Sequence, residues 1–221
     1  MARLKTGVLI SGSGTNLQAL LDHAADPDFP AEIVAVISNR PHAPGLKRAA
    51  AARVAARVID HTEFSDREGF DAALNAALIE AGCEFLCLAG FMRVLSRRFV
   101  EAWRNRLVNI HPSLLPSFRG LNAQAQAIAA GVRIAGCTVH FVRAETDSGP
   151  IIVQGAVPVL DGDNAQTLAE RILAVEHQIY PMALRMIAEG RVRVEGDRVR
   201  ILGSDPSPDR ALIAPCDGGR P

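Results

Sequence analysis

Short apolar runs alternate with amphipathic segments along most of the chain. The runs are almost continuously apolar, as expected for strands that are buried on both faces. We place these strands at residues 6–10, 32–38, 57–60, 84–89 and in a run ending at residue 108. Between them, apolar residues recur every three or four positions, which indicates helices at 15–25, 46–56, 66–81, 96–103 and 122–130. Strands that alternate with helices predict an α/β fold with a parallel sheet and right-handed crossovers.

The last third of the chain follows another pattern. Residues 134–143 and 151–159 predict two strands that form an antiparallel hairpin on the otherwise parallel sheet. Residues 165–188 show the longest helical pattern, which Pro181 is expected to kink or split. A small terminal hairpin is predicted to turn at Gly196–Asp197. We therefore expect a single domain whose mostly parallel sheet has an antiparallel C-terminal part.

Composition narrows the classes of partner. The 221 residues fit one domain, and Lys plus Arg equal Asp plus Glu at 24 each, so no global field attracts a nucleic acid. The four cysteines (Cys83, Cys87, Cys137 and Cys216) form neither a disulfide framework nor a zinc pattern, so we predict buried free thiols and no metal. No apolar run reaches transmembrane length and no signal peptide is evident, which predicts a cytoplasmic protein without a membrane partner.

A glycine turn follows the first strand. Ser11-Gly-Ser-Gly14 joins that strand to the helix at residue 15, where backbone N–H groups and the positive helix end converge. The turn therefore predicts a phosphate cradle, although a plain tight turn would have the same sequence. A dinucleotide-binding fingerprint would require glycine at the position of Leu17, which disfavours that class of ligand.

The segment Asn109-Ile-His111-Pro-Ser-Leu-Leu-Pro116 carries the most distinctive chemistry. Its two prolines prevent both a helix and a continuing strand ladder. Asn109 and His111 are two residues apart on an extended segment, so both side chains face the same way and can reach one substrate atom. A purely structural histidine is the alternative interpretation.

This segment, together with Asp147-Ser-Gly-Pro150, resembles the folate-dependent formyltransferases. Ile10-Ser-Gly-Ser-Gly-Thr-Asn16 narrows the resemblance to those members that formylate glycinamide ribonucleotide in purine synthesis. The resemblance implies a single-domain Rossmann-like formyltransferase fold over residues 1–202, with helices on both faces of the sheet. It implies phosphoribosyl binding by the N-terminal half, and folate binding and catalysis by the C-terminal half. Residues 203–221 are expected to form a flexible tail.

The resemblance also implies the chemistry. The co-substrate is 10-formyltetrahydrofolate, and neither a metal nor a covalent acyl-enzyme is required. Asn109 donates a hydrogen bond to the formyl oxygen as charge develops there, and His111 acts as a polarising donor and proton carrier. Asp147 favours the protonated imidazole, with a water relaying protons. From the residues alone, Asp147 could instead form an Asx turn before Gly149.

The implied binding residues fall into two groups. Gly14, Thr15, Asn16 and Glu176 hold glycinamide ribonucleotide, Glu176 at the ribose hydroxyls, although a solvated rim is its alternative fate. The folate group comprises Arg67, Met92, Arg93, Val94, Leu95, Asn109, Arg143, Ala144, Glu145, Thr146 and Asp147. Residues 90–95 could instead be a buried connection packed on Trp103, and strand alternation explains His140, a candidate wall of the site, equally well. The segment 120–126 lacks the histidines of many relatives, and Leu115–Pro116 is hypothesised to be a cis peptide.

Three rival functions remain open. Relatives that hydrolyse 10-formyltetrahydrofolate carry an extra N-terminal domain, for which a first strand near Thr6 leaves no room. Relatives that formylate initiator methionyl-tRNA carry a C-terminal RNA-binding domain and a basic surface, which a neutral chain does not predict. The third is a non-catalytic nucleotide-binding module. We expect small-molecule substrates and a monomer or weak homodimer.

Overall fold

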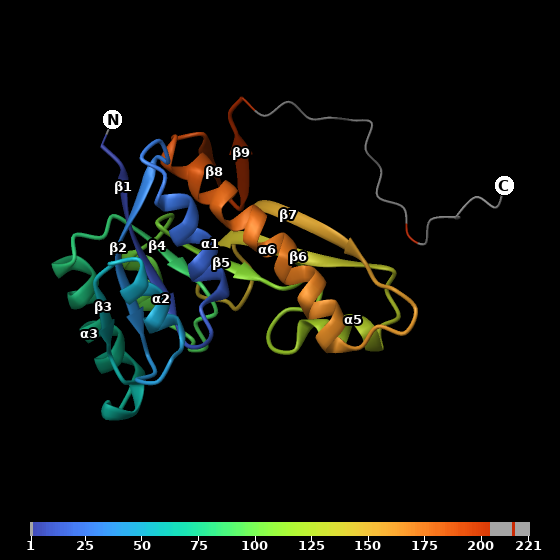
Figure 1. The fold of residues 1–221 in the computed structure, drawn as a ribbon, viewed down its shortest axis with the longest axis horizontal. Helices are drawn as coiled ribbons and strands as arrows, with labels where there is room; N and C mark the ends of the chain where they lie inside the picture. The colour runs from blue at the N-terminus through green and yellow to red at the C-terminus, as the bar shows by residue number, and fades with distance from the viewer. Residues whose placement is uncertain (1, 204–213, 215–221) are drawn as a thin grey trace.

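Seven strands form one twisted sheet in the computed structural model, which describes residues 2–203 and 214 (Figure 1). Their order is β3-β2-β1-β4-β5-β6-β7. The strands are β1 (Leu4–Ile10), β2 (Ala31–Ser38), β3 (Ala56–Val58), β4 (Phe85–Leu88), β5 (Leu107–His111), β6 (Ile134–Phe141) and β7 (Ile151–Pro158). β1 to β5 pair in parallel, whereas β6 is antiparallel to both β5 and β7. The predicted parallel sheet with an antiparallel C-terminal part is thus confirmed.

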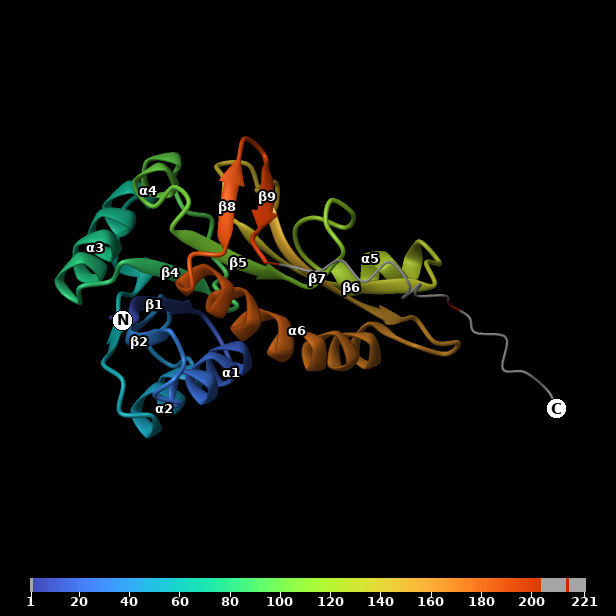
Figure 2. The ribbon, with the colours of Figure 1, turned by 90° about the horizontal axis from the view of Figure 1, so that it is seen from above.

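Helices cover both faces of the sheet, as expected (Figure 2). They are α1 (Thr15–Ala24), α2 (Gly45–Ala51), α3 (Arg67–Glu80), α4 (Arg97–Ala102), α5 (Ala123–Ala129) and α6 (Ala165–Ala188). Val8 of β1 packs in one core with Leu17 of α1 and Ile172 of α6, whereas the adjacent Leu9 packs in a second core with Phe70 of α3. Successive residues of a strand point to opposite faces, so β1 is buried from both sides and has to be apolar throughout.

Two details of the predicted elements differ in the structure. The helix predicted over 46–56 ends at Ala51, because Arg53 takes a left-handed conformation with φ of 58° and the chain then enters the three-residue β3. Pro181 does not split α6, which runs without interruption from Ala165 to Ala188 and places Pro181 in the buried core. A proline costs a helix one backbone hydrogen bond, which the burial of an apolar face can offset.

The strand expected at 57–60 is β3, which ends at Val58 and is exposed at all three residues. Other expectations about local structure hold within the described residues. The terminal hairpin consists of β8 (Val192–Glu195) and β9 (Arg198–Ile201), and Leu115–Pro116 is a cis peptide. Cys83, Cys87 and Cys137 are free and buried, and burial raises the pKa of Cys83 to about 11. The fourth cysteine and nearly all of the predicted tail lie outside the described residues. Between residues 2 and 203, no helix is both long and apolar enough to span a bilayer.

Candidate active site

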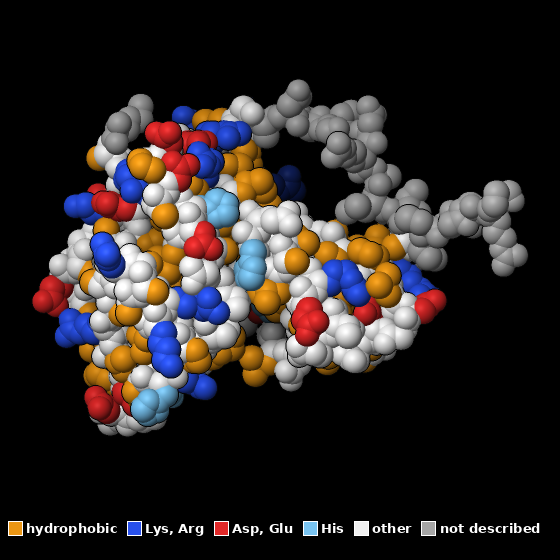
Figure 3. All heavy atoms as spheres, viewed as in Figure 1, with side chains coloured by type: hydrophobic (Ala, Val, Ile, Leu, Met, Phe, Trp, Pro, Cys, Tyr) orange, Lys and Arg blue, Asp and Glu red, His pale blue; other side chains and the backbone are white. Residues whose placement is uncertain are grey.

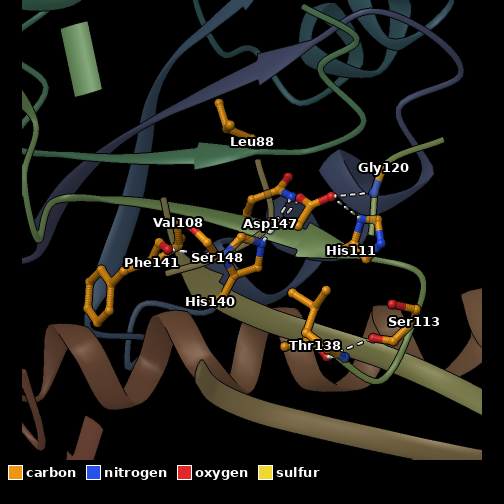
Figure 4. Close-up of polar contacts among 12 residues, drawn as sticks. Leu88, Val108, His111, Ser113, Gly120, Thr138, His140, Phe141, Asp147 and Ser148 are labelled. Atoms are coloured by element: carbon orange, nitrogen blue, oxygen red, sulfur yellow. Dashed lines mark hydrogen bonds and ion pairs between the residues drawn. The ribbon is translucent and has the colours of Figure 1, made fainter. Parts of the chain in front are cut away.

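His111, His140 and Asp147 meet where β5 pairs with β6 (Figure 4). Asn109 joins them through a hydrogen bond to His140. Asn109 lies across from His140 in the antiparallel register, and His111 lies across from Thr138. Neighbouring cross-strand residues on one face of an antiparallel pair are close enough to interact, so the two strands bring the polar side chains together. The sheet register therefore brings Asn109, His111 and His140 together, and the segment between β6 and β7 adds Asp147.

Thr138 fixes the chain that follows His111. Its hydroxyl donates to the carbonyl of Ser113 over 2.7 Å and accepts from the backbone N–H of Leu115 over 3.1 Å. Gln154 of β7 adds a hydrogen bond to the carbonyl of Leu115 over 2.9 Å. The segment around the cis Leu115–Pro116 peptide is thus tied to two strands, which holds the imidazole of His111 at the end of β5.

Both ring nitrogens of His111 face oxygen atoms. Nε2 donates to the carbonyl of Phe118 over 2.9 Å, and Nδ1 lies 3.4 Å from Oδ2 of Asp147. An imidazolium can donate in both directions, whereas a neutral ring has only one N–H to give. The side chain of His111 is 6% exposed and that of Asp147 11%, so water screens this pair only weakly.

Asp147 has a conformation that serves the pair. Its φ is 50°, and its Oδ2 accepts the backbone N–H of Gly120 over 2.8 Å. The carboxylate is thus directed toward His111 and Gly120. Its other oxygen, Oδ1, lies 3.8 Å from Nε2 of His140.

His140 orients the amide of Asn109. The carbonyl of Phe141 accepts from Nδ1 of His140 over 3.0 Å, which leaves Nε2 without a proton in the neutral ring. Nε2 therefore accepts from Nδ2 of Asn109 over 3.3 Å. Burial lowers the pKa of His140 to about 4, so the ring is neutral at physiological pH and the tautomer is set by Phe141. One N–H of the Asn109 amide remains for another acceptor.

The glycine turn forms the second part of the site. Gly14 precedes α1 with φ of 70°, and a Cβ at this position would lie 2.7 Å from the Cα of Gly45. Arg48 of α2 donates from Nε to the carbonyl of Ser13 over 2.9 Å. The first turn of α1 therefore presents its free N–H groups beside a guanidinium, which is a suitable setting for an anion.

Asn16 and Glu176 link the turn to α6. Nδ2 of Asn16 donates to Oε2 of Glu176 over 2.7 Å, and Glu176 is only 6% exposed. Burial raises the pKa of Glu176, while the hydrogen bond from Asn16 and the charge of His111 act in the opposite direction. Oδ1 of Asn16 is buried and has no hydrogen-bond partner among the described residues. Glu176 is thus buried beside Asn16 and within electrostatic reach of His111, and not on a solvated rim.

Only some of the predicted folate residues line a common cavity. A cavity of about 530 Å³ is lined by residues 61, 64–67 and 92–94, which brings Arg67 together with Met92, Arg93 and Val94. Met92 and Val94 are 61% and 54% exposed, whereas Phe91 and Leu95 pack with Trp103, so the loop is only partly the buried connection that was the alternative. We call this space the first cavity.

Other predicted folate residues do not line the first cavity. Leu95 is buried in the core that contains Trp103. The guanidinium of Arg143 donates to Oδ1 of Asn105 over 2.7 Å, and exposed Glu145 pairs with Arg97 at 3.4 Å. Ala144 and Thr146, which lie between them and Asp147, are not buried.

Several residues that complete the site were not predicted from the sequence. Phe118 and Gly120 act through their backbones, which leave no signal in residue type. Ser11 donates to Oδ1 of Asn39 over 2.5 Å and accepts from the N–H of Met92 over 2.7 Å, which ties the glycine turn to the loop of the first cavity. In residues 2–203 and 214, no group of three or more His, Cys, Asp or Glu is placed to hold a metal ion.

Comparison with known proteins places this arrangement in a family. A profile described as formyl transferase matches residues 4–184. The chain belongs to the formyl transferase family. The family member named phosphoribosylglycinamide formyltransferase from Escherichia coli (strain K12) is 41% identical over 187 residues, which cover 85% of this chain and 88% of that protein.

Two further formyl transferases define the extent of the match. The trifunctional purine biosynthetic protein adenosine-3 of Gallus gallus is 50% identical over 87% of this chain, but the chain spans only 19% of that protein's length. The crystal structure of glycinamide ribonucleotide transformylase 1 from Symbiobacterium toebii has 54% identity and a TM-score of 0.89, with coverage of 90% of this chain and 94% of that one. The formyl transferase fold predicted from the sequence motifs is thus confirmed.

Proposed function

We propose that the chain transfers the formyl group of 10-formyltetrahydrofolate to the amine of glycinamide ribonucleotide, as a step of purine biosynthesis. The observation that carries the proposal is the position of His111, 3.4 Å from Asp147 and within electrostatic reach of the buried Asn16–Glu176 pair. A proton-carrying pair beside an anion-binding turn matches a reaction between a formyl donor and a phosphorylated amine. The names of the relatives agree with this reaction.

The first step is addition of the amine to the formyl carbon. A C–N bond forms, and the carbonyl electrons move onto the oxygen. The free N–H of Asn109 donates to that oxygen, and His111 contributes its charge. Removing one such donor costs on the order of 10²–10³ in rate in other enzymes. His140 fixes which edge of Asn109 carries the N–H groups, so the donor is set before the substrate arrives.

The second step is collapse of the tetrahedral intermediate. The bond between the formyl carbon and N10 of the folate breaks, one proton leaves the attacking nitrogen, and one reaches N10. At 3.4 Å, the contact between His111 and Asp147 is longer than the 2.7–2.9 Å or so of a charge-assisted hydrogen bond. We infer that this edge of the ring exchanges protons with the reacting atoms through a water, while Nε2 stays on Phe118.

The substrates occupy the two ends of the site. Gly14, Thr15 and Asn16 bind the phosphoribosyl end, and the carboxylate of Glu176 accepts from ribose hydroxyls. Arg67 and residues 92–95 bind the folate in and beside the first cavity, and the backbone of 143–147 covers its pterin. His140 does not contact the substrates itself but orients Asn109, which does. The chain acts in the cytoplasm on small molecules, as a monomer or weak homodimer, with no membrane or nucleic-acid partner.

The decisive experiment separates transfer from hydrolysis. Purified protein is mixed with formyl folate, with and without glycinamide ribonucleotide, and deformylation of the folate is followed. Transfer requires the ribonucleotide, so turnover without it would favour the hydrolase. Folate binding without any turnover would favour the non-catalytic module.

The same assay tests the assigned residues. Asp147→Asn is expected to lower kcat by about 10²–10³, because the carboxylate no longer balances an imidazolium at His111, while the KM for both substrates changes little. Asp161→Asn is the matched control, since its side chain is 91% exposed. Wild-type kcat in Asp147→Asn, with the protein folded by circular dichroism, would exclude Asp147 from the mechanism.

A further inference from the structure

The loop of residues 90–96, between β4 and α4, forms part of the wall of the first cavity, yet its backbone is held by two side chains. Among the described residues, two of its N–H groups have hydrogen-bond acceptors, and neither acceptor is a backbone carbonyl. The hydroxyl oxygen of Ser11 accepts from Met92 over 2.7 Å. Oδ2 of Asp71 accepts from Ser96 over 2.6 Å. The shape of the loop therefore depends on one anchor near each end.

Asp71 is an unusual residue for its place in the core. It is 3% exposed and shares the buried face of α3 with Phe70 and Leu74. Its Oδ1 is buried and has no hydrogen-bond partner in the part of the chain that the structure describes. Burying a polar oxygen without a partner costs free energy, so stability alone does not account for a carboxylate here. The contact that accounts for it is the one between its other oxygen and Ser96.

The same face of α3 meets both the first cavity and the loop. Phe70 and Asp71 lie three and four residues after Arg67, which places the three side chains on one face of the helix. Arg67 lines the first cavity, and the guanidinium of Arg93 lies over the ring of Phe70, 4.7 Å from its centre. Asp71 holds Ser96, which is the N-cap residue of α4. The helix that contributes a lining residue thus also fixes the loop that lines the same cavity.

We propose that Asp71 is a positioning residue for the formyl folate, because it sets the loop of the first cavity and thereby the affinity for that substrate. The inference rests on the proposed function, since it requires a folate in the first cavity. Asp71 is buried, so it acts on the substrate through Ser96 and the loop. The glycine turn is held by other contacts, from Arg48 to Ser13 and from the N–H of Gly45 to the turn. Binding of the ribonucleotide is therefore expected not to depend on Asp71.

Two substitutions separate the hydrogen bond from the rest of the side chain. Asp71→Ala removes the acceptor of the Ser96 N–H, and the KM for formyl folate is expected to rise about ten- to a hundredfold, the range for one hydrogen bond to a charged group. The KM for glycinamide ribonucleotide and the kcat at saturating folate are expected to stay within about twofold of wild type. Asp71→Asn keeps an oxygen that can accept from Ser96 and is expected to restore most of the folate affinity.

Asp163→Ala is the matched control. The side chain of Asp163 is 5% exposed, and its Oδ2 accepts from the N–H of Leu160 over 2.8 Å, in a turn that does not line the first cavity. This variant therefore also loses a buried carboxylate that holds a turn, and its melting temperature is expected to fall, but both KM values are expected to match wild type. A similar rise in its KM for formyl folate would show that lost stability in general, and not the anchor at Ser96, weakens folate binding.

Hydrogen–deuterium exchange of the wild type gives a measurement that needs no variant. The Ser96 amide is expected to be protected in the free protein, because Asp71 accepts from it. Tetrahydrofolate, the deformylated product, is expected to slow exchange further in residues 90–96. A Ser96 amide without protection, or a loop whose exchange tetrahydrofolate leaves unchanged, would overturn the proposal even if Asp71→Ala does not fold.

The kinetic outcomes distinguish this inference from the proposed function. An unchanged KM for formyl folate in Asp71→Ala, folded by circular dichroism, would overturn the role of Asp71 while leaving formyl transfer intact. Equal rises in the KM for both substrates would also overturn it, because they would assign Asp71 to the fold as a whole. Absence of transfer by the wild type would overturn the proposed function and this inference with it.

Discussion

At the scale of single residues, the site depends on which nitrogen of each histidine carries a proton. In His111, the carbonyl of Phe118 holds a proton on Nε2 and directs Nδ1 at Asp147. In His140, the carbonyl of Phe141 holds a proton on Nδ1 and leaves Nε2 as an acceptor. The two imidazoles therefore carry their protons on different nitrogens and have different partners. His140 is suited to remain neutral, because burial lowers its pKa.

The neutrality of His140 has a consequence for stability. Its pKa is about 4 in the folded protein and close to 6.5 in the unfolded chain, so the unfolded state binds more protons between these values. The contribution of His140 to the free energy of unfolding is therefore fully present above about pH 6.5 and is lost as the pH falls toward 4. The loss amounts to about 3 kcal/mol, at about 1.4 kcal/mol per pKa unit. Urea unfolding at about pH 7 and about pH 4.5 measures it.

His140→Gln serves as the control, because glutamine has no charge to gain. The variant is expected to lose less stability than wild type over the same interval. Carboxylates whose pKa is lowered, Asp60 and Asp163, lose their contribution only as the pH falls through and below their ordinary value of 3.8, so the two windows are largely separate. Identical pH dependence in His140→Gln and wild type would show that the histidine is not buried as a neutral ring.

At the scale of elements, the residue pattern predicted the features that depend on residue type alone. The apolar runs became strands, and the segment from Asn109 to Pro116 left β5 where its prolines required. The helix α2 was predicted too long because the residues after Ala51 are good helix formers. Arg53 takes a left-handed conformation, which its side-chain type does not predict. The backbone partners Phe118 and Gly120 were missed for the same reason. Sequence patterns identify residue types, whereas the fold alone decides which carbonyl or N–H meets them.

The glycine turn before α1 offers a matched pair of substitutions. Gly14→Ala would place a Cβ 2.7 Å from the Cα of Gly45 and force alanine into φ of 70°, which costs roughly 1–2 kcal/mol. Gly12→Ala would meet nothing within 4 Å and needs no positive φ. We expect Gly14→Ala to lower the melting temperature and to raise the KM for glycinamide ribonucleotide, because the first N–H groups of α1 move. Gly12→Ala is expected to melt like wild type.

Thermal melts and initial rates at varied ribonucleotide concentration measure both effects. If Gly14→Ala raises the KM for the formyl folate and leaves that for the ribonucleotide unchanged, the turn does not bind the phosphoribosyl end. Equal melting temperatures of the two variants would mean that the close approach of α2 to the turn is not needed for the fold.

At the scale of the whole molecule, sheet order explains why distant segments form one site. β1 lies between β2 and β4, so its turn opens at the point where the order of strands reverses, which is where ligands bind in such sheets. β5 then joins the antiparallel pair of β6 and β7, which adds His140 and Asp147 from a later part of the chain. Acidic and basic side chains are interspersed over the face of the molecule in Figure 3, in keeping with a net charge of zero. Charge selection therefore has to be local, as at Arg48 beside the glycine turn.

We propose that residues 1–202 fold and act as a formyltransferase without the rest of the chain. The terminal hairpin packs against the main core through Val192, Val194, Val199 and Ile201. Arg191 donates a hydrogen bond to the carbonyl of Leu202 over 3.0 Å. A chain truncated after Gly203 keeps these contacts and is expected to match the full chain in melting temperature and turnover. Truncation after Gly190 removes four half-buried apolar side chains and is expected to cost several kcal/mol, at roughly 1 kcal/mol each. Melting curves and the transfer assay on both truncated chains decide the matter, since a loss of stability in the longer one would place part of the folding unit beyond residue 203.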